Sequence, residues 1–345
     1  MNTRVLLRER PVGAIEPEKT FEVVRAPMDA HQLLEGDVLV RTLFLSLDPA
    51  MRGWLDDKPS YLPPVKIGAV MRGGSMGVVV ESKNAAFAAG DLVDAQGTGG
   101  WQQYFVDRKA RNLLKLDPGT DLLAAMGPLG MTGLTAYFGL LEVGKPRAGE
   151  TIVVSGAAGA TGSVVGQIGK IMGCRVVGMA GTDEKCRWLT EELGFDGAIN
   201  YRTAGGAAGL DKALREHCPK GVDVYFDNVG GDILDAVLLR LRMRARVVLC
   251  GAISQYNSEA VAGPKNYLTL LTKRATMAGF IVFDYLARYA EARAQLQAWL
   301  DNGKLKFKVD VIDGLENAPQ GLLKLFTGAN KGKLAVQCAP LPSKL

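Results

Sequence analysis

Apolar and polar residues follow two different patterns along the chain, and the pattern changes near residue 126. The first 120 residues contain short β-branched runs, such as 38–43 and 77–81, separated by turns rich in glycine and proline. Runs of this kind predict a β-rich, barrel-like domain with long loops.

Beyond residue 126, short apolar strands alternate with segments whose apolar residues recur at helical spacing. This alternation predicts an α/β domain with a parallel sheet and helices on both faces. We expect strands at 151–155, 174–179, 198–201, 222–227 and 246–250, and helices at 162–172, 184–193 and 283–302.

Two further apolar segments, 305–313 and 333–338, follow the last expected helix. They lie outside the repeating strand–helix unit, so they could return to the first domain. We therefore expect a doubly wound domain at 126–312 and a β-rich domain formed by 1–125 together with 313–345.

A glycine-rich run lies between the strand expected at 151–155 and the helix that follows it. Residues 155–163 read S-G-A-A-G-A-T-G-S, a loosened form of the G-x-G-x-x-G loop that binds a dinucleotide pyrophosphate. Gly159 would let the backbone approach a phosphate, and Gly162 would let the helix pack closely on the strand. The N–H groups and dipole of the helix N-terminus attract an anion. The alternative is a glycine-rich turn that binds nothing.

The residues after the next strand favour NADPH over NADH. An NAD site carries an acid about 20 residues beyond the loop, where it binds the ribose hydroxyls, and Ala180 stands at that position. Asp183 and Glu184 come later, at an expected helix start that acids commonly cap. Lys185 is placed to meet a 2′-phosphate, and Tyr201 ends the following strand. The alternative for Lys185 is a solvated helix charge.

Composition narrows the function classes further. The apolar fraction is 48% and the charged fraction 22%, both ordinary for a globular protein. The 42 glycines suggest backbone held close to a ligand, and the only histidines are His31 and His217. With no C-x-x-C pair, we expect no metal site. The net charge of +5 is small, and the basic run 240–246 has no interleaved aromatic residue. We therefore expect a solvated turn before a strand there, and no nucleic-acid partner.

Targeting signals are few. No segment approaches the 18 consecutive apolar residues of a membrane span, and the N-terminal residues become charged too early for a signal peptide. The C-terminal tripeptide, Ser343-Lys344-Leu345, matches the peroxisomal address. We expect a cytoplasmic protein, or a peroxisomal one if its source is eukaryotic.

Several runs in fixed order resemble one family over nearly the whole chain. They are S-L-D-P at 46–49 with M-R-G at 51–53, G-P-L-G-M-T-G-L-T-A-Y at 127–137, the loop at 156–166, G-T-D-E-K at 181–185, F-D-N-V-G-G at 226–231, C-G-A-I-S-Q-Y-N at 250–257, G-F-I-V at 279–282 and G-A-N-K-G-K at 328–333. The chain resembles the zinc-independent medium-chain dehydrogenases/reductases, and within them the prostaglandin/leukotriene, plant alkenal double-bond and bacterial curcumin reductases. The zinc-dependent relatives carry a G-H-E motif and a cysteine-rich lobe, which this sequence lacks.

The resemblance implies a Rossmann domain, a GroES-like partial barrel and a homodimer. It also implies a reaction, the transfer of hydride from NADPH to the β-carbon of an α,β-unsaturated aldehyde or ketone. The oxyanion formed on the carbonyl needs a donor, which the family supplies with a ribose hydroxyl and a tyrosine that matches Tyr256. A phenol with a pKa of about 10 is protonated at neutral pH and can donate. The alternative is that Tyr256 only holds the ribose.

The same resemblance carries over the cofactor-binding residues. Cys250 is expected as a small buried residue near the cofactor rather than as a nucleophile. The expected set is Gly159, Ala160, Thr161, Gly162, Lys185, Tyr201, Asn228, Cys250, Ile253, Tyr256, Phe280, Ile281, Val282, Met131, Thr135 and Asn330.

One position departs from the family in the part of the chain that would face the substrate. Many relatives have a tyrosine after the Asp-Pro of the S-x-D-P run, and here the residue is Ala50. We therefore expect a wider pocket at Ala50, with Tyr61 or Trp54 compensating for the missing ring.

Two other functions remain open from the sequence. A quinone or carbonyl reductase on the same fold would use the same cofactor loop, so the loop does not separate it from an alkene reductase. A non-catalytic NADPH-binding protein is the second alternative.

Overall fold

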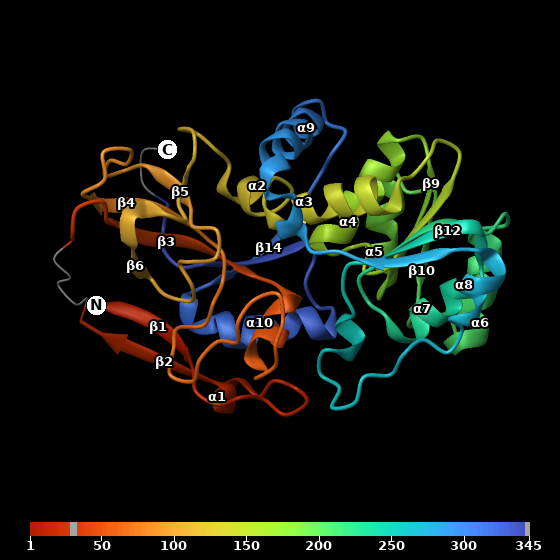
Figure 1. Ribbon diagram of the computed structural model, residues 1–345, viewed down its shortest axis with the longest axis horizontal. Coiled ribbons are helices and arrows are strands. Elements are labelled where there is room, and N and C mark those ends of the chain that lie inside the picture. Colours follow the sequence, from red (N-terminus) through yellow and green to blue (C-terminus); the bar gives the residue numbers. More distant parts are fainter. Residues whose placement is uncertain (28–32, 342–345) are drawn as a thin grey trace. The chain divides into compact units, whose positions relative to one another are not determined.

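The computed structural model describes residues 1–27 and 33–341, which form two compact units (Figure 1). The first unit comprises Met1–Met126, Val309–Asn330 and Leu334–Leu345, and the second comprises Gly127–Lys308 and Lys331–Lys333. The domain boundaries expected at 125/126 and 312/313 stay a prediction. His31 and the tripeptide Ser343-Lys344-Leu345 lie outside the described residues.

The second unit is built on a six-stranded parallel sheet, as the alternation of strands and helices predicts. Its strand order is β10-β9-β8-β11-β12-β13, so the direction of winding reverses between β8 and β11. Loops after the strands on either side of such a reversal form the ligand crevice of doubly wound folds. The strands are β8 (Thr151–Val154), β9 (Arg175–Ala180), β10 (Gly197–Asn200), β11 (Val222–Asp227), β12 (Leu241–Leu249) and β13 (Thr276–Gly279).

Helices cover both faces of this sheet, because alternate residues of a strand point to opposite sides. Ile152 and Val154 pack in one buried cluster with residues of α3, α4 and α9, whereas Val153 packs in another with residues of α6 and α7. The helices are α3 (Met131–Phe138), α4 (Ala160–Ile171), α5 (Asp183–Arg187), α6 (Gly206–His217), α7 (Gly231–Leu238), α8 (Leu268–Lys273) and α9 (Tyr289–Asp301). The expected α/β fold class is confirmed.

Two of the expected helices are not α-helical throughout. The segment expected at 184–193 is α-helical only over α5 and continues as a π-helix, η4 (Trp188–Glu192). The segment expected at 283–302 begins as a 3₁₀ helix, η6 (Val282–Arg288), in which Tyr285 departs from helical geometry, and α9 follows. Apolar spacing locates these segments, but it does not separate helix types whose backbone hydrogen bonds differ in span by one residue.

The basic run 240–246 is a strand rather than the solvated turn we expected. Strand β12 already begins at Leu241. Its pairing with β11 is irregular, because Val222 pairs with Leu241 but Val224 pairs with Arg246. Arg244, in the irregular part of β12, has a φ of 61°. Three arginines of this run pair with acids distant in sequence. Arg242 contacts Asp223 at 2.9 Å, and the other two pairs are Arg240–Asp211 and Arg246–Glu150, both at 2.5 Å.

The first unit contains a seven-stranded sheet and a separate two-stranded sheet, β1–β2. The C-terminal strands β14 and β15 belong to the larger sheet, in which β15 pairs with β3 and β14 lies beyond β15. Residues 305–308 of the first expected apolar segment belong to the second unit instead. Its strands are β1 (Asn2–Leu7), β2 (Phe21–Ala26), β3 (Val38–Leu47), β4 (Ser75–Ser82), β5 (Leu92–Asp94), β6 (Tyr104–Asp107), β7 (Leu114–Lys115), β14 (Val309–Asp313) and β15 (Lys333–Gln337). Its helices are α1 (Pro17–Thr20), η1 (Pro49–Leu55), α2 (Leu122–Met126) and α10 (Ala318–Thr327).

Candidate active site

The glycine-rich loop connects β8 to α4, and its glycines are required by close backbone contacts. A Cβ on Gly162 would lie 2.4 Å from the carbonyl oxygen of Gly156, which itself has a φ of 58°. Gly159 is the N-cap of α4 and contributes no side chain to cap it. The first turn of α4, with Ala160 and Thr161, therefore presents backbone N–H groups at a helix N-terminus. This loop fits a dinucleotide pyrophosphate.

A buried carboxylate, Asp227, anchors the edge of the sheet where this loop begins. Its side chain is fully buried, and its Oδ1 accepts four hydrogen bonds. The donors are the Ser155 hydroxyl at 2.8 Å, the Tyr225 hydroxyl at 2.7 Å and the backbone N–H groups of Val229 and Gly230 at 3.0 and 2.9 Å. Since Ser155 follows β8 and Asp227 ends β11, this cluster joins the loops on the two sides of the winding reversal.

The turn after β11 is tied to both neighbouring loops through Asn228. Its backbone N–H donates to the Ser155 hydroxyl at 2.9 Å, and its side-chain Nδ2 donates to the Ser155 carbonyl at 2.7 Å. Its carbonyl oxygen accepts the backbone N–H of Ile253 at 3.3 Å. The structure therefore brings Asn228 and Ile253 to the same edge of the sheet as the glycine-rich loop.

Tyr256 lies in the loop that follows β12. Its hydroxyl accepts the backbone N–H of Ala252 at 3.2 Å, and a Cβ on Gly251 would lie 2.9 Å from that hydroxyl. A phenol hydroxyl can donate one hydrogen bond as well as accept one. The loop thus fixes the position of the Tyr256 phenol, and one 3₁₀ turn separates Tyr256 from Ile253.

Cys250 opens the same loop and is not activated as a nucleophile. Its backbone N–H donates to the Asp227 carbonyl at 2.9 Å. Burial, together with the nearby Asp227 carboxylate, raises the pKa of the Cys250 thiol to about 12. Because the thiolate is the reactive form, the thiol stays protonated and inert at neutral pH.

Lys185 and Tyr201 both lie near the carboxyl end of β9. Lys185 belongs to the first turn of α5, where the Thr182 hydroxyl caps the helix by accepting the Lys185 backbone N–H at 3.2 Å. A Cβ on Gly181 would lie 2.9 Å from the Tyr201 hydroxyl and 3.2 Å from Nε of Arg202. Polar and cationic groups from two strand ends therefore gather around Gly181.

The two acids that follow β9 are paired with other side chains of the protein. Asp183 accepts a hydrogen bond from the Asn200 side chain at 2.7 Å, and Glu184 pairs with Lys331 at 2.5 Å. The position at which an NAD site would carry an acid is Ala180, which is buried. This arrangement suits a phosphorylated ribose better than one with two free hydroxyls.

The remaining expected residues of the second unit lie on α3 and after β13. Met131 is 38% exposed, and its sulfur accepts the Tyr289 hydroxyl at 3.8 Å, while the Thr135 hydroxyl donates to the Met131 carbonyl at 2.7 Å. The Phe280 ring packs edge-on against Phe226, with centroids 6.4 Å apart. Ile281 precedes η6 and Val282, the first residue of that helix, is buried.

Three expected residues belong to the first unit, namely Ala50, Tyr61 and Asn330. Asn330 is 8% exposed. Ala50 lies in η1, and the Tyr61 hydroxyl accepts a hydrogen bond from Nε1 of Trp54 at 3.3 Å.

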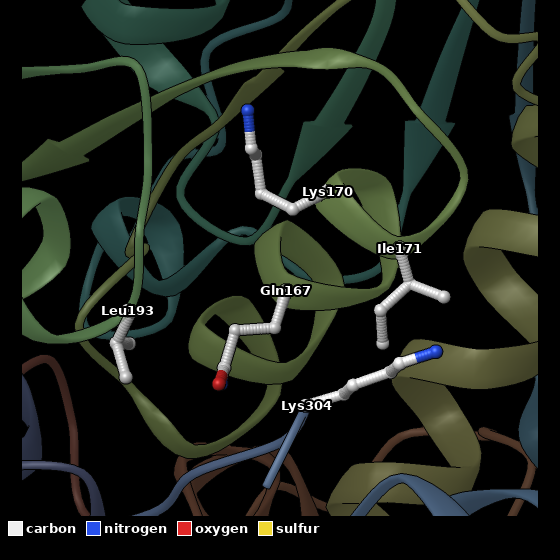
Figure 2. Close-up of a pocket in the computed structure, with 5 residues that line it drawn as sticks. All are labelled: Gln167, Lys170, Ile171, Leu193 and Lys304. Atoms are coloured by element: carbon white, nitrogen blue, oxygen red, sulfur yellow. The ribbon is translucent and has the colours of Figure 1, made fainter.

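A separate hollow of about 300 Å³ lies beside α4 and is shown in Figure 2. Two of its polar side chains are paired within the protein, because Lys170 pairs with Asp196 at 2.7 Å and Gln167 bonds the Lys306 backbone through both ends of its amide. It includes none of the expected site residues. The lining side chains are Gln167, Lys170, Ile171, Leu193 and Lys304.

Sequence reasoning missed two contributors to the site. Asp227 was predicted only as part of the F-D-N-V-G-G run, although an acid that ends a strand of largely apolar residues is a signal of a buried anchor. Gly332 forms a β-bridge with Gly159, and its N–H donates to the Ala158 carbonyl at 3.2 Å. The G-A-N-K-G-K run therefore contacts the glycine-rich loop directly.

Within the described residues the structure has neither a cluster of metal-ligating side chains nor a membrane-spanning helix. No three His, Cys, Asp or Glu side chains within 1–27 and 33–341 lie close enough to hold a metal ion. In the same part of the chain, no helix is both long and apolar enough to cross a membrane.

Comparisons with known proteins place the chain in a family. Residues 3–116 match the family model of the N-terminal domain of oxidoreductase, and residues 160–298 match that of zinc-binding dehydrogenase. NADPH-dependent curcumin reductase from Escherichia coli is 45% identical over 98% of this chain and 97% of its own. The 2-alkenal reductase (NADP(+)-dependent) of Nicotiana tabacum is 42% identical over 97% of both chains.

A solved structure agrees with this relationship. CurA from Vibrio vulnificus in complex with NADPH superposes with a TM-score of 0.91 and is 41% identical, covering 98% of this chain and 100% of that one. The chain therefore belongs to the medium-chain dehydrogenase/reductase family, as its motifs predicted. Within that family it falls in the group that contains the curcumin and alkenal reductases.

Proposed function

We propose that this protein reduces the carbon–carbon double bond of α,β-unsaturated aldehydes and ketones with NADPH. Its relatives support the proposal, since proteins named for curcumin and alkenal reduction match it over nearly their full lengths. The observation that carries it is the position of the Tyr256 phenol, held by Ala252 in a loop that contacts Asn228 beside the glycine-rich loop.

In the proposed reaction the protein binds and orients NADPH and the substrate, and it polarises the substrate carbonyl. The backbone N–H groups at the start of α4 would hold the pyrophosphate, and Lys185 with Tyr201 would hold the 2′-phosphate. NADPH, when bound, supplies hydride for the β-carbon and a ribose hydroxyl as one donor to the carbonyl oxygen. Tyr256 supplies the second donor, and its O–H bond stabilises the negative charge that develops on that oxygen. Protonation at the α-carbon by water completes the saturated product.

Product analysis tests this function against its alternatives. The purified protein is incubated with NADPH and a panel of enals, enones and quinones, and the products are identified by mass spectrometry. A saturated aldehyde or ketone is expected. An allylic alcohol or a hydroquinone as the main product would instead indicate a carbonyl or quinone reductase, and NADPH binding without turnover would indicate a non-catalytic protein.

Replacing Lys185 by alanine should change the cofactor preference. A charge-assisted contact with a 2′-phosphate stabilises bound NADPH but not NADH, so the ratio of kcat/KM for NADPH to that for NADH should fall by roughly 10–100-fold. Steady-state kinetics with both cofactors measure this ratio. Lys212→Ala, which removes an exposed lysine of α6, should leave the ratio unchanged. An unchanged ratio in Lys185→Ala would show that Lys185 is a solvated helix charge.

We further propose that two copies associate through the second unit. Strand β13 is an edge of the six-stranded sheet. The segment that connects β12 to β13 exposes apolar side chains, with Val261 and Leu271 both at 76% and Leu268 at 62%. Unpaired strand edges and apolar patches favour association. Sedimentation should give twice the 36.9 kDa chain mass, and Leu271→Glu should shift it towards that of one chain. Val12→Glu, at an exposed apolar position of the first unit, should leave the sedimentation mass unchanged. A monomeric wild type would contradict the proposal.

A further inference from the structure

Helix α3 continues into a π-helical turn, η3 (Gly139–Gly144), whose first residue leaves no room for a side chain. Turns of this type are rare and occur frequently at functional sites. A Cβ on Gly139 would overlap Cζ of Phe280, and it would lie 2.8 Å from Cε1 of that ring and 2.8 Å from Cε2 of Phe226. Non-bonded carbon atoms pack at about 3.5–4.0 Å. The Phe280 ring therefore lies directly against the backbone of Gly139.

Two neighbouring residues of this helix hold the segment that begins after β13 and runs into η6. Against Gly139, the Phe280 ring also packs edge-on against Phe226, which is fully buried on β11. One residue earlier, the Phe138 ring stacks on Tyr285 of η6, with centroids 4.6 Å apart and planes 7° from parallel. Because Phe280 and the residue after it belong to no helix or strand, their position depends on these ring contacts.

Phe280 leaves the sheet beside the loop that carries Tyr256. Strand β13 ends at Gly279, which pairs with Leu249 at the end of the parallel strand β12. Since the carboxyl ends of parallel strands meet at one edge of a sheet, the segments that follow these two strands lie at the same edge. The stretch from Phe280 to Val282 is also the one expected to line the nicotinamide. The contact of the ring with η3 therefore supports the part of the chain that would face the reacting ring of the cofactor.

We propose that Gly139 is a positioning residue for hydride transfer, because its missing side chain seats the Phe280 ring and so fixes the 280–282 backbone against which the nicotinamide would lie. This inference rests on the proposed function. Gly139 acts through Phe280 and is assigned no contact with the substrate. All the residues that carry the inference belong to the second unit.

Alanine at this position would change the packing and not the backbone geometry. Gly139 has φ and ψ of −60° and −42°, which are ordinary helical values that alanine adopts without strain. The added methyl group would instead push the Phe280 ring by about 1 Å, since Phe226 is held in the close-packed core. A misplacement of about 1 Å, caused far from the reacting atoms, can lower a rate by about 100-fold.

The first test separates the nicotinamide half of the cofactor from its adenosine half. In Gly139→Ala, kcat for an enone should fall by roughly 10–100-fold, and NADPH should bind about 5-fold more weakly, the effect of losing contacts worth one net hydrogen bond. Calorimetric titration with 2′,5′-ADP, which lacks the nicotinamide, should give the wild-type affinity. Four strand spacings of about 4.8 Å separate β9, where the adenosine half would bind, from β13.

Removing the tip of the Phe280 ring should rescue this variant. Leucine has no atoms at the positions of Cε1 and Cζ, which the new Cβ would meet. The double variant Gly139→Ala/Phe280→Leu should therefore have the kcat of Phe280→Leu alone within about twofold, because residues in contact have losses that do not add. Additive losses would overturn the proposal. If Gly139→Ala alone is too unstable to assay, the double variant should still fold, and an unfolded double variant would overturn the proposal as well.

Gly144 supplies a matched control in the same π-helical turn. A Cβ there would meet Val224, Leu140 and Val248 at 3.2, 3.3 and 3.4 Å rather than Phe280. Gly144→Ala should lower the free energy of unfolding in urea, as an added methyl group in a packed core does, but it should keep kcat and the affinity for NADPH. If Gly139→Ala likewise lowers only the free energy of unfolding, its role is purely structural and the proposal is wrong.

The binding measurements separate this inference from the proposed function. If the wild type reduces no enone, the proposed function is wrong, and the affinities still decide whether Gly139 positions the nicotinamide. A loss of NADPH affinity in Gly139→Ala, with an unchanged affinity for 2′,5′-ADP, would support that role. Equal losses for the two ligands, or no loss for either, would overturn it.

Discussion

Tyr256→Phe should lower kcat by about 100- to 1000-fold, the usual effect of removing one oxyanion donor. The substitution removes only the hydroxyl, which the structure places against the Ala252 N–H in the loop after β12. The hydroxyl is proposed to act on charge that develops during the reaction, so its loss should affect kcat far more than the dissociation constant of NADPH.

Steady-state kinetics on an enone, together with fluorescence titration of NADPH, measure the two effects separately. Tyr104→Phe removes the hydroxyl of a β6 tyrosine that has no role in the site, and it should leave both values unchanged. A Tyr256→Phe variant with normal kcat and weakened NADPH binding would show that Tyr256 only holds the ribose.

Asp227→Ala should both destabilise the second unit and weaken NADPH binding. It removes the acceptor of four buried donors, those of Ser155, Tyr225, Val229 and Gly230. Buried donors left without a partner cost about 1–3 kcal/mol each, so even with relaxation the free energy of unfolding should fall by on the order of 3 kcal/mol. The loops that would bind the cofactor lose their common anchor at the same time.

Urea unfolding and NADPH titration would quantify these losses. Asp227→Asn keeps one acceptor oxygen of similar size, so its losses should be smaller than those of Asp227→Ala. Asp117→Ala changes an exposed acid in the turn before α2 and should alter the free energy of unfolding by less than about 0.5 kcal/mol. Wild-type stability and NADPH affinity in Asp227→Ala would contradict the role assigned to this carboxylate.

Much of the second unit could be predicted from the sequence because its signals are local. Strand β11 and the loop before α4 follow directly from an apolar run and from glycines that tight backbone contacts require, as at Gly162. The start of β12 could not be predicted, since its exposed arginines look like a polar turn. Their partners, Asp211, Asp223 and Glu150, come from other parts of the chain.

In the candidate site, too, the sequence predicted the residues that belong to local motifs but not the contacts between strands. The family motifs name Asn228 and Tyr256, but they do not reveal that Ser155 and Tyr225 converge on Asp227 from different strands.

Reduction with deuterium-labelled NADPH tests the central claim most directly. The protein is given an α,β-unsaturated ketone and NADPH carrying deuterium at the transferable position of the nicotinamide, and the product is examined by NMR. We predict a saturated ketone with deuterium on its β-carbon. Deuterium on a carbinol carbon, in an allylic alcohol that keeps its double bond, would contradict the proposal.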